Sequence, residues 1–365
     1  MSTKERPITG MVFTFDPSIC AAARLRIYPF CRYLADTGKF RFKFCPLPGE
    51  YGDLLKLPWY HKGLAMLKKI LQILLSKTYD VLILQRQLFP TGPDLMEDLL
   101  EAAHPRIVFD FDDAVFTIPA HFRPNNLNAD SVLVRELRKV PRVISMSSYV
   151  TAGNDYLKDY ALRYNKRVEV VPNTIDTELF KPQPNKSCGR SSKRTVIGWL
   201  GTSSNLYYLK QIEPALRRLS KRYPILLKVI CSSEFSMNGV PVETVPWSRS
   251  AEIKELASFD ISIVPLTDDE WTRGKCTIKV LKYMSMGIPT VASPVGFSCR
   301  VISDGENGLL ASTQEEWYEK LSLLIEDDQL RHQFSINGRR TIEEEYSYDA
   351  VIPKFGQVLE KTCID

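Results

Sequence analysis

Short apolar segments alternate with amphipathic ones through the first half of the chain. The former predict strands and the latter helices, because half-buried strands repeat every two residues and helices every three to four. Strands are predicted over residues 11–15, 40–45, 81–85, 106–110, 142–146 and 168–172. Helices are predicted from Ala21 to about Gly38, near 62–77 and near 93–103. This repeated order indicates a mostly parallel sheet covered by helices.

The same pattern starts again in the second half. Strands are predicted over 195–200, 227–231, 261–264 and 290–292, and helices near 206–222, 249–257, 276–286 and 314–326. The stretch 182–194 is rich in Ser, Lys, Pro and Arg, which predicts a linker. We therefore expect two doubly wound α/β domains, residues 1–181 and 195–348, that face a ligand cleft at the carboxyl ends of their strands. The amphipathic segment 349–365 can cap its own domain or cross back to the first.

The charge of the chain is unevenly distributed. The formal net charge is only +5, but the residues up to Lys77 contain thirteen Lys or Arg against five Asp or Glu. Such a bias attracts nucleic acid, anionic lipid or an anionic substrate. Since aromatic and basic residues are not interleaved as in nucleic-acid-binding modules, we expect no nucleic-acid partner.

Cysteine usage and apolar segments indicate the compartment. The eight cysteines include no CxxC pair, and no histidine stands at metal-ligand spacing, so neither structural zinc nor a disulfide framework is expected. No secretory signal is visible, and no apolar run reaches the roughly 18 residues of a transmembrane helix. We expect a cytoplasmic protein, with contact at the inner face of the membrane as an option.

One predicted helix, residues 62–77, is both basic and amphipathic. Its leucines form one helical stripe, and most of its lysines lie off that stripe. The stripe consists of Leu64, Leu67, Leu71, Leu74 and Leu75. We expect this stripe to pack against the sheet of its own domain. Peripheral contact with an anionic membrane is the alternative.

Three carboxylates follow the predicted strand 106–110. Strand alternation, if it continues, places Asp110 and Asp112 on one face and Asp113 on the other. Carboxylates at the carboxyl end of a strand can bind a divalent metal, accept a proton or hold sugar hydroxyls. A purely structural cluster is the alternative.

Two segments of the second half are suited to binding an anion. Gly201 follows the strand 195–200, and hydroxyls directly after it can cap the next helix. Further on, Arg273, Lys275 and Lys279 lie within seven residues at the start of the helix 276–286. A helix N-terminus with nearby cations is suited to a phosphate or diphosphate, although an ordinary exposed basic loop has the same composition.

Taken together, these segments resemble the GT-B glycosyltransferases, and within them the retaining family 4-like enzymes (glycosyl transferases group 1) of bacterial type. The block 274–296, which starts with Gly-Lys, contains Gly-Ile-Pro-Thr-Val and ends with Pro-Val-Gly, is the most specific. Supporting segments are 110–116, 153–157, 171–180, 196–201, 259–266 and 302–310. The resemblance implies two Rossmann-like domains, the second binding a nucleoside diphosphate sugar and the first an acceptor. It also implies that the C-terminal helix crosses back to the first domain.

The resemblance assigns roles to individual residues and expects no metal or other cofactor. The catalytic candidates are Lys275, Lys279, Asp112 and Asp113. The donor-binding candidates are Gly201, Thr202, Ser203, Arg273, Gly274, Thr277, Ile278 and Lys282. The chain departs from the family at two glutamates eight residues apart, which Gly274 and Lys282 replace. Diphosphate binding by Lys275 and Lys279 is therefore a firmer expectation than ribose recognition at Lys282.

The leading hypothesis is a retaining, hexosyltransferase-type enzyme. It would move a sugar from a nucleoside diphosphate donor to a hydroxyl of a glycan or lipid-linked acceptor, in polysaccharide or glycolipid synthesis. The missing glutamates motivate one alternative, a non-catalytic GT-B-like scaffold. A GT-B-type nucleotide-sugar epimerase, which needs no acceptor, is another.

Overall fold

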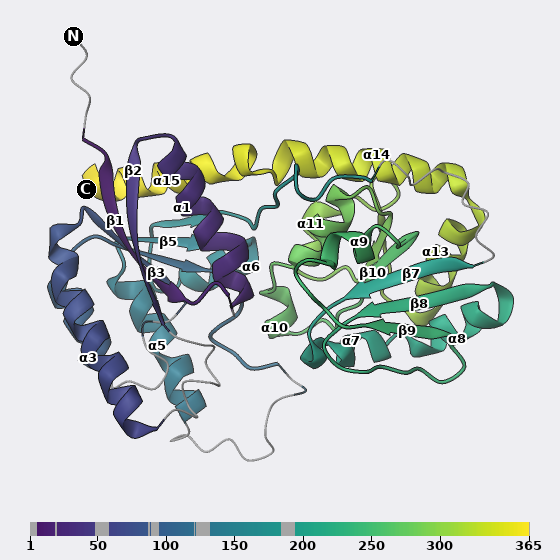
Figure 1. The fold of residues 1–365 in the computed structure, drawn as a ribbon, viewed down its shortest axis with the longest axis horizontal. Coiled ribbons are helices and arrows are strands. Elements are labelled where there is room, and N and C mark those ends of the chain that lie inside the picture. Colours follow the sequence, from purple (N-terminus) through teal and green to yellow (C-terminus); the bar gives the residue numbers. More distant parts are fainter. Residues whose placement is uncertain are drawn as a thin grey trace, which may run out of the picture. The chain divides into compact units, whose positions relative to one another are not determined.

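The computed structural model describes residues 6–18, 20–47, 58–86, 88, 95–119, 121, 132–183 and 194–364, with the backbone alone for 132–136. The chain divides into two compact units (Figure 1). Unit 1 comprises Met1–Thr174, Gly274–Cys276 and Val351–Asp365, and unit 2 comprises Ile175–Arg273 and Thr277–Ala350. Most of the predicted linker 182–194 lies outside the described residues.

Unit 1 contains a six-stranded parallel sheet. Its strands are β1 (Ile8–Phe15), β2 (Phe40–Leu47), β3 (Val81–Gln85), β4 (Ile107–Phe111), β5 (Tyr149–Ala152) and β6 (Val168–Val170). They lie in the order β2-β1-β3-β4-β5-β6. The strand order reverses between β1 and β3, and ligands of doubly wound sheets bind at the carboxyl ends of strands beside such a point.

The helices of unit 1 connect these strands. They are η1 (Ala23–Ile27, a π-helix), α1 (Tyr28–Asp36), α3 (Trp59–Leu75), α4 (Leu95–Ala103), α5 (Val132–Met146) and α6 (Asp155–Ala161). A last helix, α15 (Tyr348–Ile364), belongs to unit 1 from Val351 onward. Its Phe355 ring lies 5.3 Å from the ring of Phe30 in α1.

Unit 2 contains a second six-stranded parallel sheet. Its strands are β7 (Thr195–Leu200), β8 (Ile225–Ile230), β9 (Val242–Val245), β10 (Ile261–Val264), β11 (Thr290–Ala292) and β12 (Leu309–Leu310). The order is β12-β11-β10-β7-β8-β9, so the reversal falls between β7 and β10. The carboxyl ends of these two strands are therefore the expected ligand position in this unit.

The helices of unit 2 follow its strands, and two apolar clusters form its core. The helices are α7 (Leu206–Lys210), α8 (Glu213–Arg222), α9 (Glu252–Leu256), α10 (Glu270–Arg273), α11 (Ile278–Ser285), α12 (Ser298–Val301), α13 (Gln314–Glu326) and α14 (Asp328–Glu345). One cluster buries Trp199 and Trp317, and the other buries Phe259 and Tyr283. The α11 helix is followed closely by Gly287, whose φ of 65° suits a residue without a side chain.

Several predicted elements are wrong in detail. Residues 142–146 form the end of α5 rather than a strand, since Val140, Val143 and Ile144 are buried at helical spacing. The strand of this region is β5, which the pattern did not predict, and β9 was also missed. The predicted helix 206–222 is two helices, with Pro214 in the first turn of the second.

The prediction that the α3 leucine stripe packs against the sheet is also wrong. All five leucines of the stripe are exposed, and the side chains that α3 buries are Lys69 and Ile73. Among the described helices, none combines the length and apolarity needed to cross a bilayer. Every cysteine that the structure describes is free.

Candidate functional site

In unit 2, a lysine and a tryptophan meet beside the turn that follows β7. The Nζ atom of Lys279, in the first turn of α11, lies 4.5 Å from the centre of the Trp199 ring. A Cβ atom on Gly201 would lie 2.3 Å from that ring and 2.9 Å from Nζ of Lys279. Only glycine therefore fits at position 201 without displacing the ring or the cation.

Hydroxyl groups gather at the carboxyl ends of β7 and β8. Ser203 Oγ lies 2.6 Å from Ser233 Oγ and 3.1 Å from Ser232 Oγ. Thr202 Oγ1 accepts a hydrogen bond from the Asn205 side chain at 2.8 Å and does not cap the following helix, so the predicted capping by Thr202 is wrong. Thr202 and Ser203 are exposed, and their hydroxyls are accessible to a polar ligand.

The start of α11 carries two further candidates. Thr277 stands directly before α11, and its Oγ1 is buried without a hydrogen-bond partner among the described residues. Ile278 packs against the apolar cluster that contains Phe259. The start of α11 is thus anchored in the core by Ile278 and carries a hydroxyl with hydrogen-bonding capacity.

Arg273, a donor-binding candidate from the sequence, pairs with a neighbouring carboxylate. It ends the short helix α10, which the sequence pattern treated as a loop. Its guanidinium forms two hydrogen bonds with Asp268, of 2.7 and 3.1 Å. These hydrogen bonds hold the pKa of Asp268 below its usual value. Arg273 is thus engaged in an exposed ion pair with Asp268, just before the start of α10.

Lys282 lies in the interior of unit 2. Its Nζ forms an ion pair with Glu252, and both side chains are almost completely buried. The same Nζ lies 5.3 Å from the centre of the Phe180 ring. The ammonium is therefore enclosed by protein groups and links α11 to α9. The sequence placed Lys282 among the donor-binding candidates and did not predict this buried ion pair.

In unit 1, the first of the three clustered carboxylates belongs to a buried ion pair. Asp110, near the end of β4, accepts hydrogen bonds from the Arg26 guanidinium at 2.7 and 2.9 Å and from Thr151 Oγ1 at 2.6 Å. Arg26 also donates to Asn173 Oδ1 at 3.1 Å. Asp110 and Arg26 are both completely buried. Removing either partner from such a pair costs about 3–5 kcal/mol, so this pair is structural.

The other two carboxylates converge on one arginine. Nη2 of Arg86, directly after β3, lies 2.8 Å from Asp112 Oδ1 and 2.5 Å from Asp113 Oδ2. The β4 strand ends at Phe111, so the strand alternation does not extend to Asp112 and Asp113. Arg86 has a φ of 63°, which is rare for a residue other than glycine and often marks a functional position.

The pKa values of the two aspartates that share this arginine shift in opposite directions. Burial opposes ionisation of Asp112, but the charges of Arg86 and Arg26 outweigh it, so the pKa of Asp112 lies below its usual value. Burial raises the pKa of Asp113, against the attraction of Arg86 and with a further rise from the neighbouring Asp112 charge. Two carboxyls whose pKa values move apart can serve as a fixed anion and a proton-exchanging group.

The segment Gly274–Cys276 is part of unit 1, although the chain on both sides of it belongs to unit 2. A Cβ atom on Gly274 would lie 2.5 Å from Cβ of Ala114, so glycine permits close packing here. The Cys276 backbone donates to the Asp112 carbonyl at 3.3 Å. The positive charge of Lys275 acts on Asp113 and opposes the rise of its pKa. Lys275 and Asp113 are therefore electrostatic partners at the carboxyl end of β4.

Sequence reasoning missed three residues of this group: Arg26, Arg86 and Asn173. The Asn173 side chain accepts from Arg26 and donates to the Cys276 carbonyl at 3.0 Å. Arg86 and Asn173 stand in no local pattern of charged residues, and Arg26 lies near Arg24 in a predicted helix. The available signal was their position, since Arg86 and Asn173 each follow a predicted strand closely.

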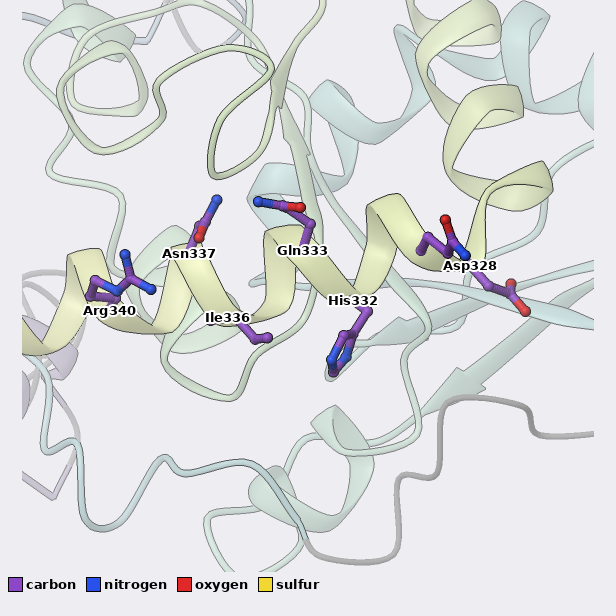
Figure 2. Close-up of a pocket in the computed structure, with 7 residues that line it drawn as sticks. Asp328, His332, Gln333, Ile336, Asn337 and Arg340 are labelled. Atoms are coloured by element: carbon purple, nitrogen blue, oxygen red, sulfur yellow. The ribbon is translucent and has the colours of Figure 1, made fainter.

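Two other features of the described residues bear on the site. They contain no cluster of three or more His, Cys, Asp or Glu side chains able to hold a metal ion. A hollow of about 610 Å³ lies along α14, lined by Asp328, His332 and Arg340 among others. Figure 2 shows that these side chains all come from one helix. No predicted site residue lines it, so it is separate from the candidate site.

The chain shares its architecture with known proteins. It is similar to sucrose-phosphate synthase from Thermosynechococcus elongatus, with 13% identity and a TM-score of 0.71 over 97% of this chain and 98% of that one. It is also similar to Anabaena HepE in complex with UDP and glucose, with 14% identity and a TM-score of 0.68 over 97% and 100%. A third similar structure is the catalytic domain of Arabidopsis thaliana starch synthase IV bound to ADP and acarbose, with 11% identity and a TM-score of 0.67 over 99% and 100%. No curated protein sequence matches the chain.

These similarities and the two parallel sheets define the GT-B fold, as predicted. Residues 207–327 match the family model of Glycosyl transferases group 1. The matched region includes β8 to β12 and α11, and therefore Lys279. The chain therefore has the GT-B fold, as predicted, and residues 207–327 within it resemble group 1 glycosyltransferases.

Proposed function

We propose that this chain is a retaining glycosyltransferase that uses a nucleoside diphosphate sugar and transfers the sugar to an acceptor hydroxyl. Similar structures were solved with UDP, UDP-glucose or ADP, which supports a donor of this class. The acceptor would be a glycan or a lipid-linked saccharide, in polysaccharide or glycolipid synthesis on the cytoplasmic side of a membrane.

The observation that carries the proposal is the position of Lys279. Its ammonium lies on the Trp199 ring beside Gly201, near the β7–β10 reversal of the sheet. Cleavage of the sugar–phosphate bond leaves negative charge on the departing diphosphate and positive charge on the sugar. A cation held in place before the reaction stabilises the departing charge without reorganisation.

The remaining parts of the donor site in unit 2 would bind the diphosphate through the backbone and hydroxyls. Gly201 allows close approach of a phosphate, and Thr202 and Ser203 carry accessible hydroxyls. The N-terminus of α11 adds a partial positive charge, and beside it the buried Thr277 hydroxyl has no partner among the residues that the structure describes. These groups would neutralise the diphosphate in place of a metal ion.

The aspartates of unit 1 would serve the acceptor. Asp112 would remain ionised and hold Arg86, because its pKa is lowered. Asp113 retains 24% of its side-chain exposure, and it can accept a hydrogen bond from an acceptor or sugar hydroxyl. The positive charge of Lys275 would favour the ionised form of Asp113. The buried Arg26–Asp110 pair would position the strand end that carries both aspartates.

A donor screen tests this proposal. The purified protein would be incubated with a panel of UDP-, GDP- and ADP-sugars, and released nucleoside diphosphate and thermal stabilisation would be measured. We expect one donor to be hydrolysed slowly without acceptor, and faster with it, with the anomeric configuration retained in the product by NMR. No stabilisation and no turnover with any nucleotide would support the scaffold alternative. Conversion of the donor sugar without nucleotide release would support the epimerase.

A further inference from the structure

The α3 helix of unit 1 presents a large apolar face that no described residue covers. Seven of its large apolar side chains are between 47% and 83% exposed: Trp59, Tyr60, Leu64, Leu67, Leu71, Leu74 and Leu75. Except for Trp59, they fall within an arc of roughly 100° on a helix of 100° per residue. Scattered exposed leucines are normal on a protein surface, but a continuous face of this kind indicates an interaction site.

The exposed face is not an alternative packing surface of the core. The buried side of α3 is already fixed by Ile73 and by Lys69, whose Nζ donates to the Cys45 carbonyl at 2.9 Å. The Lys69 ammonium also lies 4.5 Å from the centre of the Phe13 ring of β1. Rotating α3 to bury its leucines would remove these contacts, so the apolar face is directed outward by the fold itself.

The charged residues of the helix that carries this face are all cations. Residues 58–79 contain no Asp or Glu, and the helix and its end carry Lys62, Lys68, Lys69 and Lys77. Lys68 and Lys77 are exposed. The neighbouring edge strand β2 adds two exposed cations, Arg41 and Lys43. An apolar face on a helix whose charged residues are all cations complements a surface that is anionic outside and apolar beneath.

A cavity opens beside the same face. It has a volume of about 480 Å³ and is lined by residues of α3 and by the carboxyl ends of β1 and β2. Its lining includes His61, Lys68 and Lys69 together with Leu64, and Asp16 is its only acidic residue among those described. A polar, anionic head group could therefore enter this cavity while its apolar part stays beside the leucines of α3.

We propose that α3 docks unit 1 on the surface of an anionic lipid bilayer. Tyr60 and the five leucines lie in the interfacial layer, with Trp59 at one end of the helix, and Lys68 and Lys77 contact lipid phosphates. The acceptor class follows if the proposed function holds: it is a membrane-borne amphiphile whose head group enters the adjoining cavity. The α3 helix, about 25 Å long, lies along the membrane and does not cross it.

Vesicle flotation tests the docking. The full chain would be mixed with vesicles of phosphatidylcholine alone or with phosphatidylglycerol added, at low salt and at about 0.5 M NaCl. We expect flotation with the anionic vesicles that weakens with salt. Leu67→Glu/Leu71→Glu should lower vesicle binding about 100-fold or more. Lys68→Glu should lower it roughly five-fold or more.

Matched controls keep the test specific. Leu179→Glu/Leu323→Glu changes two leucines of unit 2 with similar exposure and should float like the wild type. Thermal unfolding of each variant should match the wild type, because the substituted side chains are exposed. Equal flotation of the Leu67→Glu/Leu71→Glu variant and the wild type would overturn the docking proposal. The proposal would also be overturned if the wild type does not float and is a dimer, and the Leu67→Glu/Leu71→Glu variant is a monomer.

Donor hydrolysis in the same samples separates this inference from the proposed function. Hydrolysis of a nucleotide sugar without flotation would support the transferase proposal and contradict the docking of α3 on a membrane. Flotation without any donor turnover would support docking by α3 and overturn the assignment of a lipid-borne acceptor.

Discussion

The ammonium group of Lys279 lies 4.5 Å from the centre of the Trp199 ring, at the turn where a side chain on residue 201 would collide with both. The aromatic face holds the cation by a cation–π interaction, which restricts the motion of a long side chain. A cation held in this way needs little rearrangement to stabilise negative charge that develops during a reaction. The contact also explains why the turn contains glycine.

Replacing Lys279 with Met should reduce donor turnover by about 10²–10³-fold, because the developing diphosphate charge loses its stabilising cation. The methionine keeps most of the apolar contact with Trp199, so the folded state should persist. Lys254→Met, an exposed lysine of α9, is the matched control and should leave turnover unchanged. Near-normal kcat in Lys279→Met would remove this residue from the mechanism.

Lys275 has a separate prediction, because its described electrostatic partner is Asp113 in unit 1. Lys275→Ala should lower turnover by about 10²-fold or more if this ammonium acts on the reacting groups. It should also raise the pKa of Asp113 further, since one opposing charge is removed. A pH profile of kcat/KM measures this shift, and an unchanged profile would count against the pairing.

The two aspartates beside Arg86 should behave differently when neutralised. Asp113→Asn should lower transfer to the acceptor by roughly 10²-fold while donor hydrolysis in water changes less, because this side chain is proposed to orient the acceptor. Asp112→Asn should instead lower the free energy of unfolding by about 1–3 kcal/mol, since its charge pairs with a largely buried guanidinium. Urea unfolding and the two activity assays distinguish these results. Equal loss in both assays for Asp113→Asn would contradict the acceptor role.

The strands of both sheets were predictable because buried parallel strands are short, continuous apolar runs. Residues 81–85, 195–200, 261–264 and 290–292 form strands with the predicted bounds. The segment 142–146 has the same β-branched composition but continues the helix after Pro141. There, burial at helical spacing outweighed local β-propensity, which is weak and context-dependent.

The amphipathic pattern predicted the helix α3 correctly, but it did not predict whether the apolar side of α3 is covered by protein. A helical stripe specifies which residues share a face, and only the tertiary structure decides whether that face is covered. For the same reason, the local pattern identified Asp112 and Lys279 as candidates and could not supply Arg86 and Trp199, their partners from other strand ends. Pairings across a parallel sheet depend on strand order, which is not encoded in a local motif.

The buried pair of Lys282 and Glu252 leads to a stability prediction at a position where the resemblance to the family expects a glutamate. Lys282→Glu should place two carboxylates together in the interior and lower the free energy of unfolding by about 3–5 kcal/mol. The exchange Glu252→Lys/Lys282→Glu should recover part of that loss, because the charges are again opposite. Denaturant unfolding of the three variants measures the coupling. Full stability of Lys282→Glu alone would show that the ion pair contributes nothing.

Lys69 should make the stability of the chain depend on alkaline pH. Burial lowers the pKa of its ammonium from the usual 10.5 to about 8. Between these values the unfolded chain holds a proton that the folded chain has released, so stability should rise as the pH rises through this window. Below pH 8 both states are protonated, and the cost of burying the charge is fully present.

Replacing Lys69 with Met removes this titration and isolates its contribution. The loss of the hydrogen bond to the Cys45 carbonyl shifts stability by a similar amount at every pH. The stability of Lys69→Met relative to the wild type should therefore decrease by roughly 1–3 kcal/mol between pH 7 and pH 10.5. Urea unfolding across this range measures the difference, with the exposed Lys68→Met as a control that shows no such trend. A difference that stays constant with pH would show that Lys69 keeps its proton in the folded chain throughout, contrary to its burial on the inner side of α3.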